Sequence, residues 1–470
     1  MKIVVLKFGG TSVDSHEHRL LAARKVLEVK EAGFTPVVVV SAIGRAGAPY
    51  ATDTLVNELN RIDHHIQPNK RELDMMMACG EIISAVVMAH TLKTIGCQAI
   101  ALSGGQAGII TDWDYGNARI TSIRPHPVIQ KLEQGIVPVV TGFQGVTATS
   151  PGQDHGDITT LGRGGSDTTA SALGAALKAE AVHIYTDVDG VKTADPDMVP
   201  EARTLEYCSY EEVAEIAHQG AKVVHPRAAE IAMDYGIPLW VKNTFSDHSG
   251  TCITTEEKTS CTSQRITGIT HTGKIVYIRF EMGDTPAKPE IELAIYRMLA
   301  RAGVNIYLVT FSRRALSFAV PRDLYPTVKQ LFDGLIVPVG FQRFGEDKTD
   351  IAMNKDLKFF IFRFDDGTAP AYLAQRELMR NAEDVCGVKD IQAIVVENCT
   401  MISVIAGHHR DVPGVMAEIY EALYDAGIPV LQTADSDSSV SCLVSENEVE
   451  KAVRVLHQKL ELANGKPEAG

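Results

Sequence analysis

The chain has 470 residues, 45% of them hydrophobic and 22% charged, with a formal net charge of −14. This length predicts two to four domains, each able to bury its own core. The acidic charge excludes a nucleic-acid-binding protein that relies on a basic stripe. No apolar run reaches the roughly 18 residues of a membrane span, and the N-terminus does not read as a signal peptide. We therefore expect a cytoplasmic protein with no membrane and no nucleic-acid partner.

The cysteines and histidines indicate no dedicated metal site. The 8 cysteines include no C-x-x-C pair, and the adjacent histidines lack the i, i+4 spacing of a helical metal pair. Buried free thiols and surface histidines explain both residue types.

The first thirteen residues, MKIVVLKFGGTSV, predict a strand that ends in a phosphate-binding turn. Ile3–Leu6 is too short for a helix and rich in β-branched residues, which suits a buried parallel strand. Lys7 follows, and Gly9 and Gly10 lack the Cβ atoms that would keep a ligand from the backbone. Ser12 can cap a helix. A cation beside free backbone N–H groups favours a phosphate, although a Gly-Gly turn alone is as often only a tight connection.

Strand and helix patterns then alternate, which predicts a parallel sheet covered on both faces. The expected segments are a helix at 18–32, a strand at 35–42, a helix at 68–95, a strand at 98–102, a helix at 127–134 and a strand at 136–141. The loop after the second strand carries Thr52 and Asp53, at the strand end where open α/β sheets bind ligands. Turn chemistry accounts for these two residues equally well.

One carboxylate in the long helix lies in an apolar setting. Glu81 stands in the segment ACGEIISA, so its side chain is either paired, directed into a cavity, or on a solvated stripe. The segment leaves these alternatives open.

A second glycine loop occurs at 156–172 and reads GDITTLGRGGSDTTASA. Gly162 and Gly164 flank Arg163, a residue suited to bidentate capture of an anionic group. Ser166 and Asp167 can cap the following small-residue helix. The third glycine of the dinucleotide fingerprint is missing, and the chain contains no G-x-x-x-x-G-K-[ST] loop.

The remainder of the N-terminal half offers weaker signals. A strand ends at Thr186 and Asp187 and continues into the turn VDGVKTADPD, where contact with a nucleotide and ordinary turn chemistry are equally compatible. Lys222 lies just after a glycine, at an expected helix boundary in HQGAKVVHPRA. The Ser/Thr/Glu/Lys-rich stretch at 246–265 predicts a linker.

The C-terminal part contains an internal repeat. Residues 294–320 and 418–444 align without a gap at an offset of 124. Each copy has the strand and helix order of a ferredoxin-like βαββαβ unit. Such units pair by their edge strands, which makes a homodimer or higher homo-oligomer natural.

Six motifs together give the chain a strong resemblance to the aspartokinases. They are KFGGTSV, the SA…TD loop, CGEIIS, GRGGSDTTA, TDVDG…TADP and QGAKVVHPRA, and the tandem C-terminal units resemble regulatory ACT domains. The resemblance implies an α/β fold with an amino-acid-kinase three-layer αβα sandwich and a mainly parallel sheet at 1–245. After the linker it implies ACT-like units at 266–339 and 397–470, with an extra strand–helix segment of uncertain assignment at 340–396.

The resemblance also implies transfer of the ATP γ-phosphoryl group to the side-chain carboxylate of L-aspartate, with Mg²⁺ held by phosphates and water. It assigns catalysis to Lys7 and Asp167, with Asp167 orienting Lys7. The implied aspartate-binding residues are Thr52, Glu81, Arg163 and Ser166. The implied nucleotide-side residues are Lys7, Gly9, Gly10, Ser12, Thr186, Asp187, Lys192, Asp195 and Lys222.

Two departures from the family pattern concern the nucleotide turn. Lys192 stands where an aromatic residue is common, and Asp197 stands where the family usually has arginine. Lys192 or Arg203 is a candidate replacement for the missing cation.

A related kinase with another acceptor and an amino-acid sensor without catalysis are the alternative functions.

An amino-acid effector is expected in the second ACT-like unit, which has a Pro-Gly helix entry that the first unit lacks. The candidate residues are Val412, Pro413, Gly414, Val415, Gln432 and Asp435. Lysine, threonine and diaminopimelate are the candidate effectors.

Overall fold

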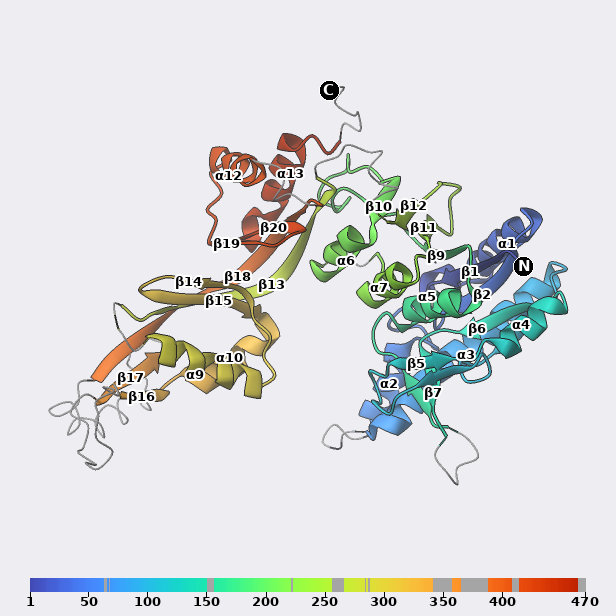
Figure 1. Cartoon of the computed structure of the whole chain (residues 1–470), viewed down its shortest axis with the longest axis horizontal. Helices are drawn as coiled ribbons and strands as arrows, with labels where there is room; N and C mark the ends of the chain where they lie inside the picture. Colours follow the sequence, from blue (N-terminus) through green and yellow to red (C-terminus); the bar gives the residue numbers. More distant parts are fainter. Residues whose placement is uncertain are drawn as a thin grey trace, which may run out of the picture. The chain divides into compact units, whose positions relative to one another are not determined.

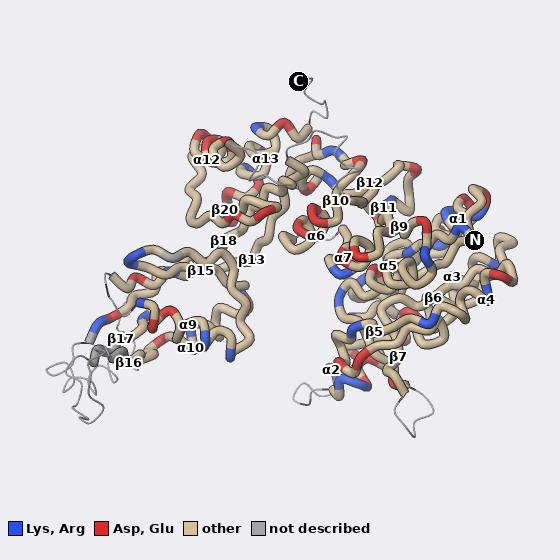
Figure 2. The backbone as a smooth tube through the Cα atoms, viewed as in Figure 1, with Lys and Arg blue, Asp and Glu red and all other residues tan. Residues whose placement is uncertain are grey.

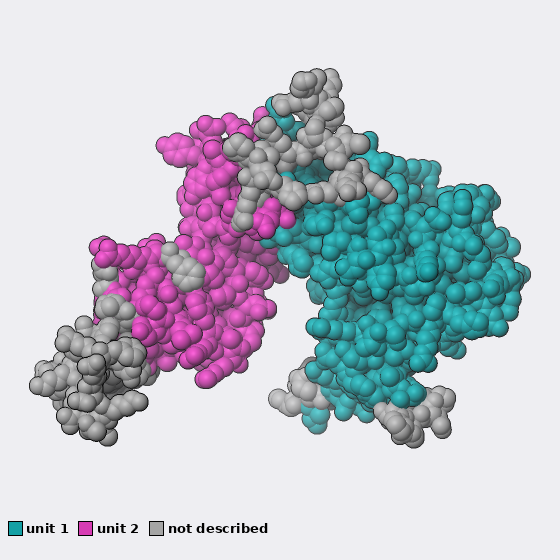
Figure 3. All heavy atoms as spheres, viewed as in Figure 1, with its two compact units in different colours: residues 1–270, 405–413, 460–470 teal, residues 271–404, 414–459 magenta. Residues whose placement is uncertain are grey.

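The computed structural model describes residues 1–62, 66, 68–149, 156–220, 223–255, 266–283, 285, 288–340, 357–364, 388–407 and 414–463. The chain forms two compact units (Figure 3). Unit 1 comprises residues 1–270, 405–413 and 460–470, and unit 2 comprises residues 271–404 and 414–459.

An eight-stranded sheet forms the centre of unit 1 (Figure 1). In spatial order its strands are β10 (Tyr207–Ser209), β12 (Thr251–Thr254), β11 (Leu239–Asn243), β9 (Ala181–Thr186), β1 (Ile3–Phe8), β2 (Thr35–Val40), β6 (Val137–Thr141) and β3 (Ala99–Leu102). Every neighbouring pair is parallel except β11 and β12. The predicted parallel sheet is therefore confirmed, with β1 in its interior.

Helices cover both faces of this sheet, as predicted. The helices of unit 1 are α1 (His16–Glu31), α2 (Thr52–Asn60), α3 (Lys70–Thr94), α4 (His126–Glu133), α5 (Gly165–Leu177), α6 (Tyr210–His218) and α7 (Pro226–Asp234). Side chains alternate along β1: Val4 and Leu6 share a core with α1 and α3, whereas Ile3 and Val5 share one with α4 to α7. This alternation follows from the two-residue period of a strand and produces the three-layer sandwich.

The long helix α3 belongs to this sandwich. By length and composition it is the one helix among the described residues that could cross a membrane, but half of its apolar stretch is buried inside the domain. Its inner face carries Met88 and Leu92 into the core shared with α1. A core helix of a soluble domain passes the same test of length and composition.

A small second sheet, in the order β5-β4-β7-β8, extends unit 1. Its strands are β5 (Ile120–Ile123), β4 (Ile109–Thr111), β7 (Gln144–Thr147) and β8 (Ile158–Thr160). The buried Asp74 of α3 accepts hydrogen bonds from the backbone N–H and hydroxyl of Thr160, at 2.8 and 2.7 Å. These bonds attach the small sheet to α3 just before the second glycine loop.

Unit 2 contains both copies of the repeat. Its elements are β13 (Gly268–Glu281), α9 (Lys288–Arg301), β14 (Tyr307–Phe311), β15 (Ala315–Pro321), α10 (Tyr325–Phe332), β16 (Ile336–Gly340), β17 (Leu357–Arg363), β18 (Val388–Ile405), α12 (Val415–Asp425), β19 (Gln432–Asp435), β20 (Ser439–Ser445) and α13 (Val449–Lys459). Equivalent positions of the two copies meet: Gln432 donates to the carbonyl of Leu308, and Arg322 donates to Glu446 at 3.3 Å. Both pairs are 124 residues apart, which is the offset of the repeat.

The sheet of unit 2 departs from two separate four-stranded units. Its order is β14-β15-β13-β18-β17-β16, and β20 also pairs with β18. The first copy's last strand, β16, pairs with β17 rather than with β13. The 18-residue strand β18 is long enough to serve both copies, so part of the extra segment at 340–396 completes the first copy's sheet.

The stretch at 246–265 is not a linker throughout. β12 lies within it and fills an inner position of the main sheet, between β10 and β11. All four β12 residues are buried, because a strand inside a covered sheet meets helices on both faces.

Candidate active site

An ion pair joins the two glycine loops of unit 1. Lys7 lies in β1, in register with Val39 of β2 and Ile184 of β9, and it shares the face of Ile3 and Val5 that α5 covers. Its ammonium lies 2.7 Å from the Asp167 carboxylate, in the first turn of α5. Both side chains are largely covered, at 12% and 14% exposed. Asp167 therefore lies beside Lys7, where the resemblance to the family places it, and the two glycine loops meet in the fold.

The first glycine turn lies backbone to backbone against the loop that follows β2. A Cβ atom at Gly10 would lie 2.5 Å from the Gly44 carbonyl oxygen and 2.7 Å from that of Ala42. The Gly44 N–H donates to the Gly10 carbonyl at 3.0 Å. A Cβ atom at Gly9 would lie 3.7 Å from the Lys7 ammonium nitrogen. The absence of a side chain at Gly10 therefore permits the close contact between the two loops. At Gly9 it means that the turn places no side-chain atom beside the Lys7 ammonium.

Ser12 differs from its expected position facing a ligand. Its side chain is fully buried, and its hydroxyl is hydrogen-bonded to the Thr244 hydroxyl at 2.7 Å. The hydroxyl thus links the turn to the segment after β11, because a buried hydroxyl needs a partner.

The second glycine loop is held in place from α7. Gly164 adopts a left-handed conformation with φ of +72°, and a Cβ atom there would lie 2.1 Å from the His225 ring. Arg227 donates to the Leu161 carbonyl at 3.1 Å and to the Asn117 side chain at 3.0 Å. These contacts fix the backbone of the loop on both sides of Arg163.

Arg163 remains available at the tip of this loop. Its side chain is exposed, and among the described residues it has no hydrogen-bond or ion-pair partner. Ser166, by contrast, is buried beside Gly142, where a Cβ atom would lie 2.6 Å from the serine hydroxyl. A guanidinium held at a rigid loop and lacking a partner can take a carboxylate in a bidentate pair.

Glu81, on α3, lies against the loop that follows β2, at the carboxyl end of that strand. Its side chain is 3% exposed and one carboxylate oxygen accepts from the Ala42 N–H at 3.1 Å. The other oxygen has no hydrogen-bond partner within the described part of the chain. Burial raises the pKa of Glu81 to about 8, against the lowering effect of the hydrogen bond from Ala42. Of the three alternatives for this carboxylate, the structure excludes the solvated stripe.

The predicted residue Thr52 begins α2, directly after the loop that also carries Ala42. That loop packs on α3 next to Glu81, since a Cβ atom at Gly80 would lie 2.8 Å from the Tyr50 carbonyl oxygen. Thr52 therefore lies at the end of the loop that contacts Glu81.

The nucleotide-side candidates are dispersed around the end of β9. The Thr186 hydroxyl donates to Asp187 at 3.1 Å, and Asp187 pairs with Arg45 at 2.6 Å. Lys192 donates to the Thr204 hydroxyl at 3.4 Å. Asp195 accepts from the Asp197 N–H at 3.0 Å, which closes a turn. Lys222 lies outside the described residues.

Arg203 is engaged elsewhere and does not fit the role of a replacement phosphate ligand. Its Nε donates to the Leu462 carbonyl at 3.0 Å, and its Nη2 atom is buried. This contact joins the nucleotide turn to the C-terminal tail within unit 1 and leaves Lys192 as the remaining candidate.

Several residues of the site escaped sequence reasoning although their motifs were recognised. Arg45 lies in the loop between β2 and α2, and His225 and Arg227 lie in the HPR segment at the start of α7. Each of these residues is a basic or aromatic side chain within one of the six motifs that resemble the family, and this was the signal that could have identified it. Only the fold reveals that these motifs lie against the second glycine loop and Asp187.

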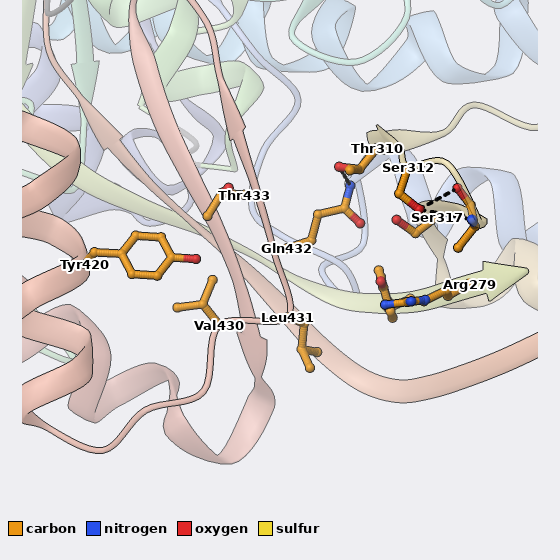
Figure 4. A pocket seen from close by; sticks show the side chains of 11 residues that line it. Arg279, Thr310, Ser312, Ser317, Tyr420, Val430, Leu431, Gln432 and Thr433 are labelled. Carbon is orange, nitrogen blue, oxygen red and sulfur yellow. Dashed lines mark hydrogen bonds between the residues drawn. The ribbon is translucent and has the colours of Figure 1, made fainter. Parts of the chain in front are cut away.

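Unit 2 contains a separate cavity of about 360 Å³, between the two copies of the repeat (Figure 4). The lining residues are Tyr277, Arg279, Thr310, Ser312, Ala315, Ser317, Tyr420, Val430, Leu431, Gln432 and Thr433. The Gln432 amide nitrogen donates to Thr310 at 2.7 Å, whereas its oxygen is buried without a partner among the described residues.

Of the predicted effector residues, Gln432 lines this cavity. Gly414 and Val415 begin α12, and Val415 is buried in the core. Asp435 lies at the end of β19 and is not among the lining residues. Val412 and Pro413 lie outside the described residues.

Comparisons with known proteins agree with this architecture. The amino acid kinase family model matches residues 2–243, and an ACT domain model matches residues 394–458. Aspartokinase 1 of Bacillus subtilis is 36% identical over 467 residues, which cover 98% of this chain and 100% of that protein. The aspartokinase of Mycolicibacterium smegmatis is 34% identical and covers 97% and 96% of the two chains.

Solved structures show the same fold over nearly the whole chain. Escherichia coli aspartokinase III, in complex with aspartate and ADP, superposes with a TM-score of 0.66 at 21% identity and covers 98% of this chain and 100% of that one. Aspartate kinase from Clostridium acetobutylicum gives a TM-score of 0.69 at 19% identity, with coverage of 97% and 100%.

Proposed function

Since this chain belongs to the aspartokinases within the amino acid kinase family, we propose that Lys7 and Arg163 align ATP with L-aspartate. Aspartokinases transfer the γ-phosphoryl group of ATP to the side-chain carboxylate of L-aspartate, giving 4-phospho-L-aspartate. The protein is an ATP-dependent kinase of this type, with an ACT domain that fits allosteric regulation. The observation that carries the residue assignment is the 2.7 Å contact between Lys7 and Asp167.

On the ATP side, Lys7 is the proposed ligand of the transferring group. An ammonium has three N–H donors, so one can be held by Asp167 while two remain for phosphate oxygens. Gly10 would bring its backbone N–H to the same phosphates. The Gly9 N–H already donates to the Tyr185 carbonyl at 3.3 Å, so Gly9 contributes by keeping a Cβ atom away from the Lys7 ammonium. Thr186, Asp187, Lys192, Asp195 and Lys222 are the proposed nucleotide-side residues, and Arg45 joins them through its pair with Asp187.

Mg²⁺ is proposed to arrive with ATP, coordinated mainly by phosphate oxygens and water. No group of three His, Cys, Asp or Glu side chains capable of holding a metal occurs in the described ranges. Lys7 and the first glycine turn would contact the phosphates rather than the metal. The ion supplies neutralisation of the phosphate charge.

On the aspartate side, Arg163 and Glu81 would fix the backbone groups of the substrate. Arg163 would take the α-carboxylate and Glu81 the ammonium, with Thr52 and Ser166 as further polar contacts. The side-chain carboxylate is then directed toward Lys7. One of its oxygens forms a bond to the γ-phosphorus while the bond from phosphorus to the bridging oxygen breaks, and ADP leaves with that electron pair. Positioning and charge neutralisation supply most of the catalysis, since both reactants are anions.

The raised pKa of Glu81 makes a prediction for the pH dependence of aspartate binding. Below pH 8 the free enzyme holds Glu81 protonated, and only the ionised carboxylate can take an ammonium. The apparent affinity for aspartate should therefore rise by up to about tenfold per pH unit toward pH 8 and level off above it. Calorimetry in buffers of different ionisation enthalpy should detect proton release on aspartate binding near pH 7.

The control for this experiment is Glu81→Gln, which cannot ionise. Its affinity for aspartate should be weak and independent of pH. Glu28→Gln, at an exposed position of α1, should keep the wild-type profile. A wild-type affinity that is flat between pH 6 and 9 would contradict the role of Glu81.

Regulation is proposed to use the cavity in unit 2, with a free amino acid as effector. Arg279 pairs with Glu281 through its Nε at 2.7 Å, which leaves the outer edge of its exposed guanidinium for the effector's α-carboxylate. The unpartnered oxygen of Gln432 is suited to the effector's ammonium. A cavity of about 360 Å³ is at the small end of ligand sites.

Edge strands of the ACT-like sheet favour a homodimer, and the cytoplasm remains the proposed location.

Thermal unfolding tests the effector site. At a concentration of about 100 times its Kd, a bound effector stabilises the folded state by about 2.7 kcal/mol. Lysine, threonine or diaminopimelate should therefore raise Tm by several degrees. Arg279→Gln should abolish this shift, whereas Arg301→Gln, at an exposed position of α9, should keep it. An undiminished shift in Arg279→Gln would exclude the proposed site.

A further inference from the structure

Arg45 lies in a loop that is fixed against the first glycine turn. It is the one basic residue of the segment 41–51, between β2 and α2. The N–H of the preceding residue, Gly44, donates to the Gly10 carbonyl at 3.0 Å, and the Arg45 carbonyl accepts from the Ala48 N–H at 2.9 Å. The backbone is therefore held on both sides of Arg45, beside the turn at which the ATP phosphates are proposed to bind.

The ion pair between Arg45 and Asp187 crosses the carboxyl end of β1. In the main sheet β1 lies between β2 and β9. Arg45 is in the loop after β2, Asp187 directly follows β9, and the two side chains meet at 2.6 Å. The Gly9 N–H also donates to the Tyr185 carbonyl at 3.3 Å, two residues before Asp187. The guanidinium is thus carried over the strand end where Lys7 and the glycine turn lie.

The same loop also contacts the aspartate side of the site. Near its start the Ala42 N–H donates to Glu81 at 3.1 Å, and Glu81 is the proposed partner of the aspartate ammonium. Three residues later Arg45 reaches Asp187, one of the proposed nucleotide-side residues. Arg45 therefore belongs to the loop that joins the two sides, where the transferring phosphoryl group has to pass.

The segment that follows β9 is acidic although a triphosphate is proposed to bind beside it. Residues 187–197 contain one lysine and four aspartates, at positions 187, 189, 195 and 197. The Lys7 ammonium is already paired with Asp167. A bound triphosphate adds further negative charge, and a cation close to it offsets that repulsion. Arg45 is a cation that already contacts this segment.

The pair between Arg45 and Asp187 can exchange partners readily. The two side chains are 74% and 37% exposed, and exposed ion pairs contribute little to stability because water competes for both charges. A guanidinium can donate two parallel N–H bonds to a phosphoryl group. Once released, Asp187 keeps the hydrogen bond from the Thr186 hydroxyl at 3.1 Å and is open to water.

We propose that Arg45 is a catalytic residue, which exchanges Asp187 for the transferring phosphoryl group when ATP is bound. Its guanidinium donates N–H bonds to the phosphoryl oxygens while the bond to ADP breaks and the bond to the aspartate carboxylate forms. It forms no covalent bond and transfers no proton. This inference rests on the proposed binding of the ATP phosphates at the first glycine turn, to which it adds a ligand from the loop after β2.

Steady-state kinetics of the full chain test the proposal. Arg45→Ala should lower kcat by about 10- to 100-fold, the loss expected for hydrogen bonds to a charged group. Arg45→Lys should recover part of this loss, because it keeps the charge without the planar fork. The matched control is Arg61→Ala, since Arg61 is 72% exposed and pairs with Glu58 at 2.6 Å. This control should leave kcat unchanged, and an unchanged Tm would show that Arg45→Ala is folded.

Nucleotide binding identifies the group that Arg45 contacts. Calorimetry of Arg45→Ala should show weaker binding of the magnesium complex of adenylyl imidodiphosphate, an ATP analogue that retains the third phosphoryl group. Binding of MgADP should stay within a few-fold of wild type, because ADP lacks that group. Equal weakening of both ligands would overturn the proposal, since Arg45 would then act on the nucleotide as a whole.

The Asp187→Asn background separates a phosphate contact from a merely structural ion pair. If Arg45 only holds Asp187 in place, Arg45→Ala should cost nothing further in that background, and this result would overturn the proposal. We expect the same fold loss of kcat as in the wild-type background, because contact with the phosphoryl group does not need Asp187.

Lys7→Ala, measured in parallel, distinguishes failure of this inference from failure of the proposed function. A loss of kcat in Lys7→Ala with none in Arg45→Ala would reject the role of Arg45 alone. No loss in either variant would reject that role together with the proposed binding of the phosphates at the first glycine turn.

Discussion

Replacing Lys7 by alanine should lower kcat by about 10²- to 10³-fold, the usual cost of removing one preorganised donor from a transition state. The ammonium is 12% exposed and held 2.7 Å from Asp167, so it is already oriented before ATP binds. Lys7 is the only basic residue of β1, so no neighbour on the strand can replace it. Steady-state measurement of ADP release at saturating ATP and aspartate gives the result directly.

A matched control distinguishes this loss from a general charge effect. Lys2→Ala removes an exposed lysine just before the same strand and should leave kcat unchanged. Asp167→Asn should give an intermediate loss, because the ammonium remains but loses its anionic partner. An unaltered kcat in folded Lys7→Ala would contradict the assignment of Lys7 to the transferring phosphoryl group.

Replacing Arg163 by alanine should raise the KM for aspartate by roughly 100-fold. Hydrogen bonds to charged groups contribute about 1.5–3 kcal/mol each, and loss of a bidentate pair at the lower value corresponds to about two factors of ten. The KM for ATP should stay within a few-fold of wild type, since Arg163 is proposed to contact only aspartate. Initial rates measured over a matrix of both substrates separate the two constants.

The control for Arg163→Ala is Arg24→Ala, which removes an exposed arginine from α1 and should change neither KM. Lysine at position 163 should recover part of the affinity but not the bidentate geometry. An unchanged KM for aspartate in Arg163→Ala would show that the α-carboxylate is bound elsewhere. A raised KM for ATP alone would move Arg163 to the nucleotide.

The sequence predicted features that depend on neighbouring residues. The strand containing Lys7, the glycines that follow it, and the loop around Arg163 are each set by a few consecutive side chains. Their meeting did not follow from the order of the parallel strands, because the loop around Arg163 follows β8, which pairs antiparallel with β7 in the small sheet. The buried state of Glu81 was anticipated as one alternative.

Contacts between distant segments could not be predicted in the same way. The bond between Ser12 and Thr244 spans 232 residues, and neither residue's neighbours indicate the other. The packing of His225 on Gly164 requires the position of α7 relative to α5. The pairing of β17 with β16 and β18 similarly depends on sheet order, which local hydrophobic patterns do not specify.

The roles of individual charged side chains also could not be predicted from the sequence. Acidic and basic residues are interspersed along the described backbone of both units (Figure 2), in keeping with the exclusion of a basic nucleic-acid-binding stripe. The net charge did not indicate which arginine side chains form hydrogen bonds or ion pairs within the protein. Arg203 donates to the carbonyl of Leu462 in the C-terminal tail, whereas Arg163 has no partner within the described residues.

Trapping of the product with hydroxylamine tests the central claim most directly. If Arg163 and Glu81 hold the α-carboxylate and ammonium, the phosphoryl group must reach the side-chain carboxylate. The enzyme with Mg²⁺, ATP and L-aspartate should then yield the β-hydroxamate of aspartate in amounts equal to the ADP released, and glutamate, acetylglutamate and carbamate should give no hydroxamate or ADP above background. Formation of the α-hydroxamate, or ADP release that does not depend on aspartate, would contradict the alignment of the two substrates between Lys7 and Arg163.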